Sequence, residues 1–362
     1  MTAPVTVVAV TPGDPAVRAV WCGLQERGGV SSPFLSWEWF SALADQPDLA
    51  RAVRVLVVRD ASRPIGLLPL EWARSARGLR TVGIPGWRWL APDHLDVVAT
   101  AGHRRVVAQA LTDHLAGRRD WDVLDLEGLD SEGSLATAVR GLLRPPRFLP
   151  RGPEPVTAPY VDLRSRPRER LVTSRKLRSQ VRRTLREAEA AGGGLSTERD
   201  PGRVEALVDE LMRLHNARLG AVSEVFATSA RRRFHRLAAR RLAGAGHARV
   251  YRLATGSGSA GLGYALSWDD RLLFYAMGID PGAALSPGMT LVGQALAGAA
   301  DEGFAELDLL RGEEAYKLRL ATGVRRDVRL RVLRPSPRTL AAAGVAVAAR
   351  VRTALRAGGA LS

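Results

Sequence analysis

The sequence predicts an α/β protein made of two tandem units, each a mixed central sheet flanked by helices. The first observation is an internal repeat. Residues 107–126 resemble residues 292–309, and each segment reads as an amphipathic helix, a short turn and a strand ending in Leu-Asp-Leu. The second observation is a hairpin pattern upstream of each copy, over residues 53–70 and 248–267. In each, two runs with the residue alternation of a β-strand flank a run of turn-forming residues.

A proline-rich run separates the two units. Residues 143–155 hold too many prolines for a helix or a central strand, so we expect an extended join. This predicts a first domain over residues 1–150 and a second over residues 151–335. Residues 336–362 form a basic, Ala-rich tail. Its pattern fits a helix that covers an edge of the fold, a helix that contacts a membrane face, or partial disorder.

The bulk composition narrows the class of protein. A chain of 362 residues with 46% hydrophobic content suits two ordinary domains with a large core. The single cysteine, Cys22, excludes an intrachain disulfide and favours a reducing, cytoplasmic location. Residues 1–10 read as a first strand without the basic start of a signal peptide, and no long apolar run predicts a spanning helix. The histidines and the cysteine show no zinc spacing, so we expect no metal.

The chain is strongly basic. It has 53 Lys and Arg against 37 Asp and Glu, which gives a net charge of +16. Such a charge favours acidic partners: phosphate-bearing cofactors, tRNA or other RNA, an acidic acyl carrier protein, or an anionic membrane face. The same arginine-rich and alanine-rich composition is common in chains from GC-rich genomes, and then much of the charge is only a solvated surface.

One basic segment forms a distinct pattern. Over residues 174–186, Leu177, Val181 and Leu185 recur at a spacing of four and arginines occupy most of the remaining faces, which predicts an amphipathic helix. This helix is a candidate for binding tRNA phosphates, an acidic acyl carrier protein or the phosphates of a cofactor. The alternative is a solvated helix with one buried stripe. No aromatic residues interleave the arginines, so base stacking is not supported.

Two segments of the second unit have residues suited to chemistry. In Ser286-Pro287-Gly288-Met289-Thr290, proline suits the first turn of a helix and glycine lets an anion approach the backbone N–H groups. The segment 312–317 follows a strand over residues 306–310, at the edge where open α/β sheets place their ligands. The alternative for the first segment is that Pro-Gly only starts a helix. The alternative for the second is a capping cluster, in which glutamates at a helix start favour the dipole and Tyr-Lys packs the following turn.

Several stretches together resemble a known group. They are Tyr275-Ala-Met-Gly-Ile-Asp-Pro281, Leu285-Ser-Pro-Gly-Met-Thr-Leu291 and Asp308-Leu-Leu-Arg-Gly-Glu-Glu-Ala-Tyr-Lys317. With the tandem halves, they resemble the double GNAT proteins, in particular the CelD/BcsL-type acetyltransferases, which are related to the Fem-type aminoacyltransferases. The usual GNAT phosphate signature, Gln/Arg-x-x-Gly-x-Gly/Ala, is absent, and the resemblance implies that the Ser-Pro-Gly turn replaces it.

The resemblance implies an N-acyltransferase that uses acetyl-CoA or another acyl-CoA and a small-molecule or glycan amine acceptor. It implies that Ser286, Pro287, Gly288, Met289 and Thr290 bind the cofactor phosphates. Catalytic roles fall to Glu313 or Glu314 as general base, Tyr316 as proton donor and Lys317 as a cation near the phosphates or the oxyanion. Substrate-side roles fall to Tyr275, His215, Arg218, Asp308 and Arg311, of which His215 and Arg218 share a helix face.

Two other functions stay open. A Fem-like transferase would take an aminoacyl group from tRNA, which the charge favours. A non-catalytic double GNAT module would bind a nucleotide or polymer in an envelope-assembly complex. The first unit lacks the Glu-Glu-Ala-Tyr-Lys segment after its Leu-Asp-Leu strand, so we expect the working site in the second unit.

Overall fold

In the computed structural model, the described residues are 5–76, 78–165, 175–220, 223, 225–283, 285–339 and 341. Ser174, the first residue of the predicted basic helix, and all of the tail after residue 341 lie outside them. Within the described part, no helix is long and apolar enough to cross a membrane.

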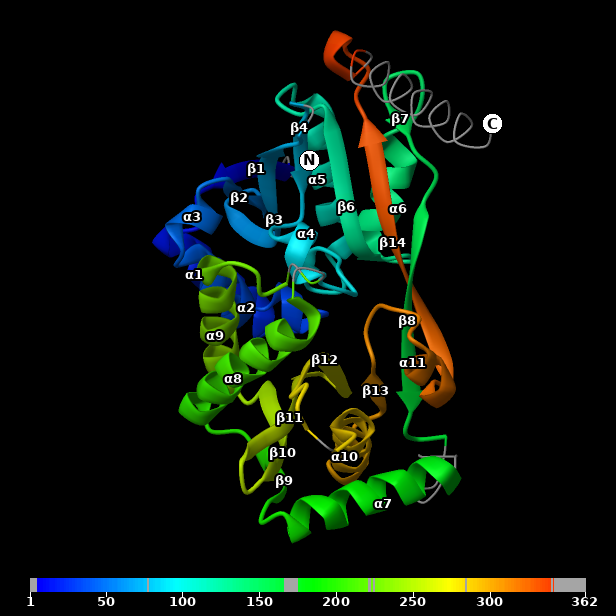
Figure 1. The fold of residues 1–362 in the computed structure, drawn as a ribbon. Coiled ribbons are helices and arrows are strands. Elements are labelled where there is room, and N and C mark those ends of the chain that lie inside the picture. The colour runs from blue at the N-terminus through cyan, green and yellow to red at the C-terminus, as the bar shows by residue number, and fades with distance from the viewer. Residues whose placement is uncertain are drawn as a thin grey trace, which may run out of the picture.

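The described strands join into one 14-stranded mixed sheet, which runs through both halves of the chain (Figure 1). Its main path has the order β1-β2-β3-β4-β6-β14-β8-β13-β12-β11-β10-β9, with β5 beside β3 and β7 beside β14. The strands are β1 (Val5–Val10), β2 (Val53–Asp60), β3 (Arg63–Arg74), β4 (Arg80–Gly83), β5 (Val98–Ala99), β6 (Val123–Asp130), β7 (Leu149–Pro150), β8 (Glu154–Asp162), β9 (Gly194–Glu198), β10 (Ala248–Thr255), β11 (Gly258–Trp268), β12 (Arg271–Ile279), β13 (Glu306–Asp308) and β14 (Gly323–Leu333).

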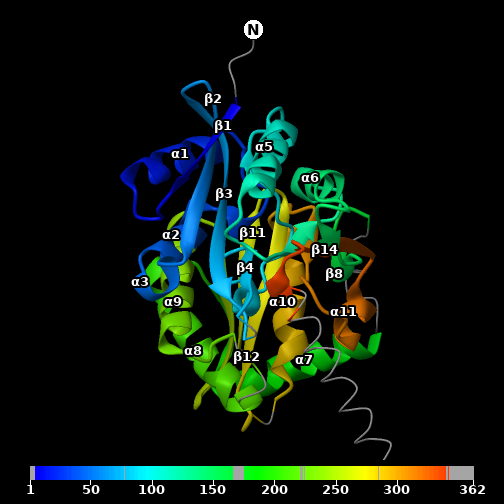
Figure 2. The same cartoon turned by 90° about the horizontal axis from the view of Figure 1, so that it is seen from above.

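Helices lie on both sides of the sheet (Figure 2). Several of them begin with a residue whose side chain caps the first turn. Asp200 accepts a hydrogen bond from the Arg203 N–H at the start of α8, and Thr228 does the same for Arg231 in α9. The helices are α1 (Pro15–Gln25), α2 (Trp37–Ala44), α3 (Pro47–Ala50), α4 (Trp87–Leu90), α5 (Arg104–Gly117), α6 (Ser134–Leu142), α7 (Arg175–Ala190), α8 (Pro201–Leu219), α9 (Ser229–Gly244), α10 (Pro287–Asp301) and α11 (Ala315–Leu320), with a 3₁₀ turn at Pro33–Leu35.

The two halves repeat one topology, as the sequence predicts. In the first half β4 pairs in parallel with β6, and α5 lies between them in the chain. In the second half β12 pairs in parallel with β13, and α10 lies between them. The antiparallel runs β1-β2-β3 and β9-β10-β11 precede these pairs. The prediction of two tandem α/β units, each a mixed sheet with flanking helices, is confirmed.

One strand of the second half joins the two halves. β8, which begins the second half, pairs with β13 of the same half. β14, which ends the second half, pairs with β6 of the first half through Asp327–Leu333. β8 and β14 pair with each other at the centre. The first half therefore depends on β14 of the second half to extend its sheet.

Two helices of the second half cover opposite faces of β12. A Cβ added at Gly278 would lie 2.4 Å from the Leu211 carbonyl oxygen, so α8 packs tightly on this face. On the other face, Met277 and Ile279 lie against Gly288 of α10. Helix α7 packs on α10, with Val181 opposite Gly293, and Leu185 contacts the apolar cluster below it. Val181 and Leu185 of the predicted stripe therefore form a packing face, and the side chain of Leu177 lies outside the described residues.

Candidate active site

β12 and β13 separate at the end of their short pairing. They pair only through Arg271–Leu273 and Glu306–Asp308, although β12 continues to Ile279. The chain after β13 instead follows β8, because the Leu309 N–H donates to the Pro159 carbonyl (2.9 Å). The strands therefore diverge toward the start of α10. The carboxyl end of a parallel strand beside a helix start is a common ligand position in α/β sheets.

The first half fills the matching position with its own chain. Its parallel pairing of β4 with β6 ends at Gly83, and the chain then loops out through α4. It returns so that Leu95 pairs with Leu129, and the Leu95 N–H donates to the Gly128 carbonyl at 2.9 Å. The segment around Leu95 thus takes the place beside β6 that β12 leaves open beside β13.

A cavity of about 470 Å³ lies where β12 meets α10. The structure brings most of the predicted cofactor segment and one predicted substrate residue together here. Thr290 lies behind the lining, buried, and its hydroxyl has no hydrogen-bond partner. The lining residues include Gln180 of α7, Arg218 of α8, Ile279 and Asp280 at the end of β12, and Ser286, Pro287, Gly288 and Met289.

The start of α10 leaves its first N–H groups without a side-chain cap. Ser286 is the N-cap residue, but its hydroxyl makes no capping bond, and Pro287 occupies the first turn. Gly288 is tightly placed, because a Cβ there would lie 3.3 Å from the Met277 sulfur and 3.4 Å from Ile279 Cδ1. A larger residue would have to displace these side chains. The partial positive charge of a helix start and the Arg218 guanidinium together favour an anion.

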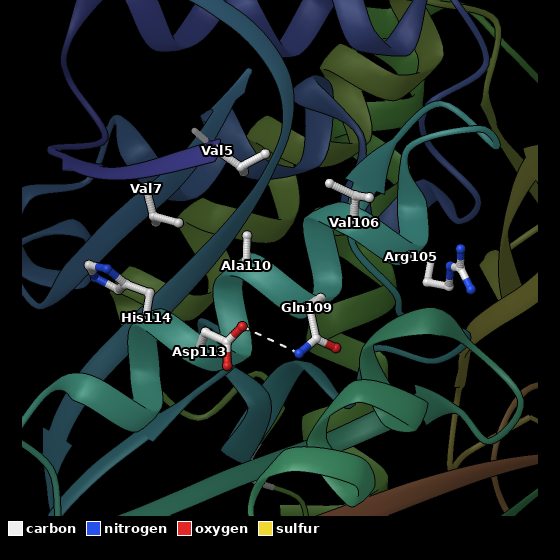
Figure 3. A pocket seen from close by; sticks show the side chains of 8 residues that line it. All are labelled: Val5, Val7, Arg105, Val106, Gln109, Ala110, Asp113 and His114. Atoms are coloured by element: carbon white, nitrogen blue, oxygen red, sulfur yellow. Dashed lines mark hydrogen bonds between the residues drawn. The ribbon is translucent and has the colours of Figure 1, made fainter. Parts of the chain in front are cut away.

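Two further hollows lie outside this cavity. One of about 580 Å³ lies on the other side of the loop after β12, and it shares Asp280 and Leu285 with the first cavity. Another of about 680 Å³ lies in the first half between β1 and α5, lined by residues such as Val7, Gln109 and His114 (Figure 3). None of the predicted site residues lines the hollow beside β1.

The predicted catalytic segment lies at α11 and does not line the cavity at α10. Glu313 accepts a hydrogen bond from the Thr157 hydroxyl (2.7 Å). Glu314 is largely exposed and pairs with the Lys317 ammonium at 3.1 Å. Lys317 is buried and donates to the Arg311 carbonyl (2.6 Å). In this arrangement Lys317 fixes the turn between β13 and α11.

Tyr316 lies deeper than its acidic neighbours. It packs against the apolar cluster that contains Leu291 of α10 and Leu309, the cluster that Met289 also contacts. Burial, and secondarily the charge of Glu314, raises the pKa of Tyr316 to about 12. Its hydroxyl therefore stays protonated at neutral pH and can act as a proton donor.

Three predicted substrate residues instead hold the two halves together. The Tyr275 hydroxyl donates to the Leu90 carbonyl (3.1 Å). Arg311 binds the Asp93 and Glu127 carboxylates, each at 2.6 Å. Asp308 is fully buried and pairs with His94 and Arg325. Their partners Leu90, at the end of α4, and Asp93 and His94, in the loop after it, make these side chains part of the interface between the halves.

The sequence reasoning missed His94 and the carboxylates around it. His94 lies between Asp308 and Asp327, at 2.9 Å and 3.1 Å. Burial lowers the pKa of His94, but the two carboxylates more than offset this and raise it to about 10. The only sequence signal is polar residues, Asp93 and His94, within an otherwise apolar stretch. Their partners lie more than 200 residues away, where no local pattern finds them.

His215 and Arg218 lie on one face of α8, as their spacing predicts. Arg218 lines the cavity, whereas His215 lies one turn earlier and contacts the Met277 carbonyl on β12. Among the described residues no group of His, Cys, Asp and Glu could hold a metal ion.

Comparison with known proteins gives one family match and a shared fold. Residues 175–318 match the family model of the acetyltransferase (GNAT) domain. No curated protein matches the chain. Three solved structures share the fold: L-PGS from Bacillus licheniformis (13% identity, 91% of this chain and 95% of that chain, TM-score 0.56), FemX (9%, 90% and 96%, 0.55) and the C-terminal domain of a putative lysylphosphatidylglycerol synthetase from Agrobacterium fabrum (10%, 93% and 95%, 0.53).

Proposed function

We propose that this protein is an N-acyltransferase that moves an acyl group, most simply acetyl, from acyl-CoA to an amine. The observation that carries the proposal is the cavity where the uncapped start of α10 meets Arg218 at the diverging end of β12. The GNAT family match over residues 175–318 supports the reaction type.

The start of α10 suits the pyrophosphate of the donor. The backbone N–H groups of Gly288 and Met289 point out of the first turn, as in any helix start, and can donate to phosphate oxygens. Arg218 supplies a guanidinium that binds two oxygens at once. Gln180 of α7 adds an amide to the same wall. These residues bind and orient the donor so that its acyl arm extends along β12.

The reaction needs a neutral amine and a protonated or stabilised thiolate. The amine nitrogen attacks the thioester carbonyl, the C–N bond forms, and the C–S bond breaks as the thiolate leaves. Tyr316, which is protonated at neutral pH, supplies a proton to the thiolate. Lys317 holds the turn that carries Tyr316. The sequence predicts the base at Glu313 or Glu314, and each of these already has a partner.

The acceptor is proposed from the family resemblance. The CelD/BcsL-type likeness favours an amino sugar or another precursor of an exopolysaccharide or cell envelope. The hollow beyond the loop after β12 supports a polyhydroxylated or cationic ligand, because hydroxyls of Thr255 and Ser257 and carboxylates of Glu187 and Asp280 line it.

The test is titration of the purified protein with acetyl-CoA and with desulfo-CoA by calorimetry, followed by a thiol-release assay with a panel of amines. Micromolar binding that weakens at least tenfold in Gly288→Glu supports the site, since the added carboxylate repels the pyrophosphate. Absence of binding by the wild-type protein contradicts the proposal.

A second candidate is a transferase that takes an aminoacyl group from tRNA. The observation that favours it is α7, whose arginines at 175, 178, 182, 183 and 186 accompany Gln180 at the cavity wall. The same charge suits an acidic acyl carrier protein or an anionic membrane face. Copurification with RNA and a steep salt dependence of RNA binding would favour the tRNA donor over acyl-CoA.

A further inference from the structure

His215 occupies a defined position between a strand and a loop. Its Nδ1 lies 3.2 Å from the Met277 carbonyl oxygen on β12, and its Nε2 lies 2.8 Å from the hydroxyl oxygen of Ser223. The ring also packs edge-on against Phe226, with the ring centres 4.9 Å apart. Three separate contacts therefore fix the orientation of the imidazole.

These contacts determine which nitrogen carries the proton. A carbonyl oxygen can only accept, so Nδ1 must be the protonated nitrogen that donates to Met277. In neutral imidazole the other nitrogen, Nε2, then carries a lone pair. The Ser223 hydroxyl donates to this lone pair. The result is a chain of two hydrogen bonds, from Ser223 through His215 to the Met277 carbonyl, with a basic nitrogen at its centre.

The surroundings keep this imidazole neutral. Burial lowers the pKa of His215, the bond to Met277 partly opposes this, and the Arg218 guanidinium on the same helix lowers it further. His235 of the packed helix α9 interacts with His215, but complete burial lowers the pKa of His235 to about 3, so it is uncharged. At neutral pH His215 is therefore free to accept a proton.

His215 is next to the proposed donor cavity in two directions. Along α8, Arg218 lies one turn later on the same face and lines the cavity. Along β12, Ile279 lies two residues beyond Met277 and also lines the cavity. An acyl arm that runs from the start of α10 back along β12 approaches Met277, the residue whose carbonyl His215 contacts.

We propose that His215 is the general base of the transfer reaction, with Ser223 as the relay that contacts the acceptor amine. The inference rests on the proposed function. As the amine nitrogen bonds to the thioester carbon, the nitrogen gives its proton to Ser223 Oγ, and Ser223 gives its own proton to His215 Nε2. The C–S bond then breaks. Solvent removes the proton from His215 and restores the proton that Tyr316 gave to the thiolate.

Two features favour His215 over the acidic residues before α11. Glu313 is bonded to Thr157 and Glu314 is paired with Lys317, so neither carboxylate is free. The tetrahedral intermediate carries an acidic ammonium, which a neutral imidazole of modest pKa can deprotonate.

The experiment compares His215→Asn with wild type. Asparagine places an amide donor near the position of Nδ1, so it can keep the bond to Met277 while removing the base at Nε2. We expect kcat/KM to fall at least a hundredfold, as for loss of a general base, while the Kd for acetyl-CoA stays within twofold. Ser223→Ala should give a smaller loss. His103→Asn, at an exposed histidine of the first half, is the matched control and should retain full activity.

The pH profile separates a base from a structural strut. In wild type, kcat/KM should fall on the acid side as His215 becomes protonated, and this limb should disappear in His215→Asn. Retained activity with the acid limb intact overturns the assignment of His215. Loss of the acid limb of the kcat/KM profile also overturns it if the melting temperature falls and acetyl-CoA binding weakens to the same extent. In that case His215 has a structural role only. If the wild-type protein itself binds no acyl-CoA, the proposed function fails and not this assignment alone.

Discussion

His94 Nε2 lies 2.9 Å from the Asp308 carboxylate, so a side chain of the first half pairs with the last residue of β13 in the second. On its other side His94 Nδ1 lies 3.1 Å from Asp327 of β14. Both carboxylates are fully buried, as their exposed side-chain fractions of 0% show. One imidazolium thus joins three chain segments at the point where β12 and β13 begin to diverge.

Removing the charge of His94 should strongly destabilise the protein. The change His94→Asn leaves two buried carboxylates without their shared cation, and breaking a buried pair costs about 3–5 kcal/mol. Urea unfolding followed by circular dichroism measures this free energy. His114→Asn, on α5 and away from both carboxylates, is the control. A loss below about 1 kcal/mol in His94→Asn would contradict the assigned role.

Stability should also depend on pH through His94. Its pKa is raised from about 6.5 in the unfolded chain to about 10 in the folded protein, so the folded state holds its proton more tightly. The stabilisation is complete below pH 6.5 and is lost as pH rises toward 10. In His94→Asn this decline between pH 6.5 and 10 should be much shallower. Melting temperatures at half-unit pH steps test the difference.

Neutralising Arg218 should weaken donor binding selectively. Arg218 lines the cavity at the start of α10, whereas Arg213 on the same helix points to solvent beside Glu210. We expect Arg218→Ala to raise the Kd for acetyl-CoA about tenfold or more, since a charge-assisted bond to phosphate is worth about 1.5–3 kcal/mol. Arg213→Ala should change it less than twofold. Equal effects of both substitutions on binding would show that only the overall charge matters.

The halves should not fold apart. A fragment of residues 1–150 lacks β14, so the edge of β6 that pairs with Asp327–Leu333 would be open. We expect this fragment to aggregate or to unfold without a cooperative transition. Coexpression with residues 151–362 should restore a soluble complex, visible by size-exclusion chromatography. A monomeric fragment with a sharp melting transition would contradict the dependence of the first half on β14.

The sequence predicts the repeat because it is local. Helix periodicity in residues 107–117 and 292–301, and the turn at Pro287, depend on neighbours a few residues away. The pairing of β14 with β6 of the first half leaves no such trace, because strand partners are chosen by tertiary packing. The burial of Asp308 and Arg311 is likewise set by Asp93 and His94, more than 200 residues earlier.

The candidate site was predicted in part for the same reason. The Ser286 to Met289 turn and Arg218 line one cavity. Both could be predicted because each follows a local rule: the turn starts a helix, and Arg218 lies on a predicted helix face. The contact of His215 with Met277 depends on how closely α8 packs on Gly278, which helix periodicity does not reveal. The roles assigned to Glu313, Glu314, Tyr316 and Lys317 stay predictions.

Substitutions at Tyr316 and Glu314 distinguish proton donation to the leaving thiolate from removal of the amine proton. Tyr316→Phe removes the hydroxyl and keeps the packing of the ring, so we expect kcat to fall about tenfold to a hundredfold with little change in the Kd for acetyl-CoA. Glu314→Gln removes an exposed charge, and exposed ion pairs are worth at most about 1 kcal/mol. If His215 is the base, Glu314→Gln should keep kcat/KM within about threefold.

The thiol-release assay measures both variants with acetyl-CoA, and a slower donor, followed by the acylated amine that forms, tests the chemistry itself. An acyl-oxyester analogue of the donor has a more basic leaving group, so the defect of Tyr316→Phe should grow with it if the hydroxyl protonates the departing atom. Tyr160→Phe, whose ring lies beside Arg325 on β14, is the control for a tyrosine outside α11. Full activity of Tyr316→Phe with both donors would remove Tyr316 from the reaction. A hundredfold loss in Glu314→Gln would instead return the base to the acidic segment before α11.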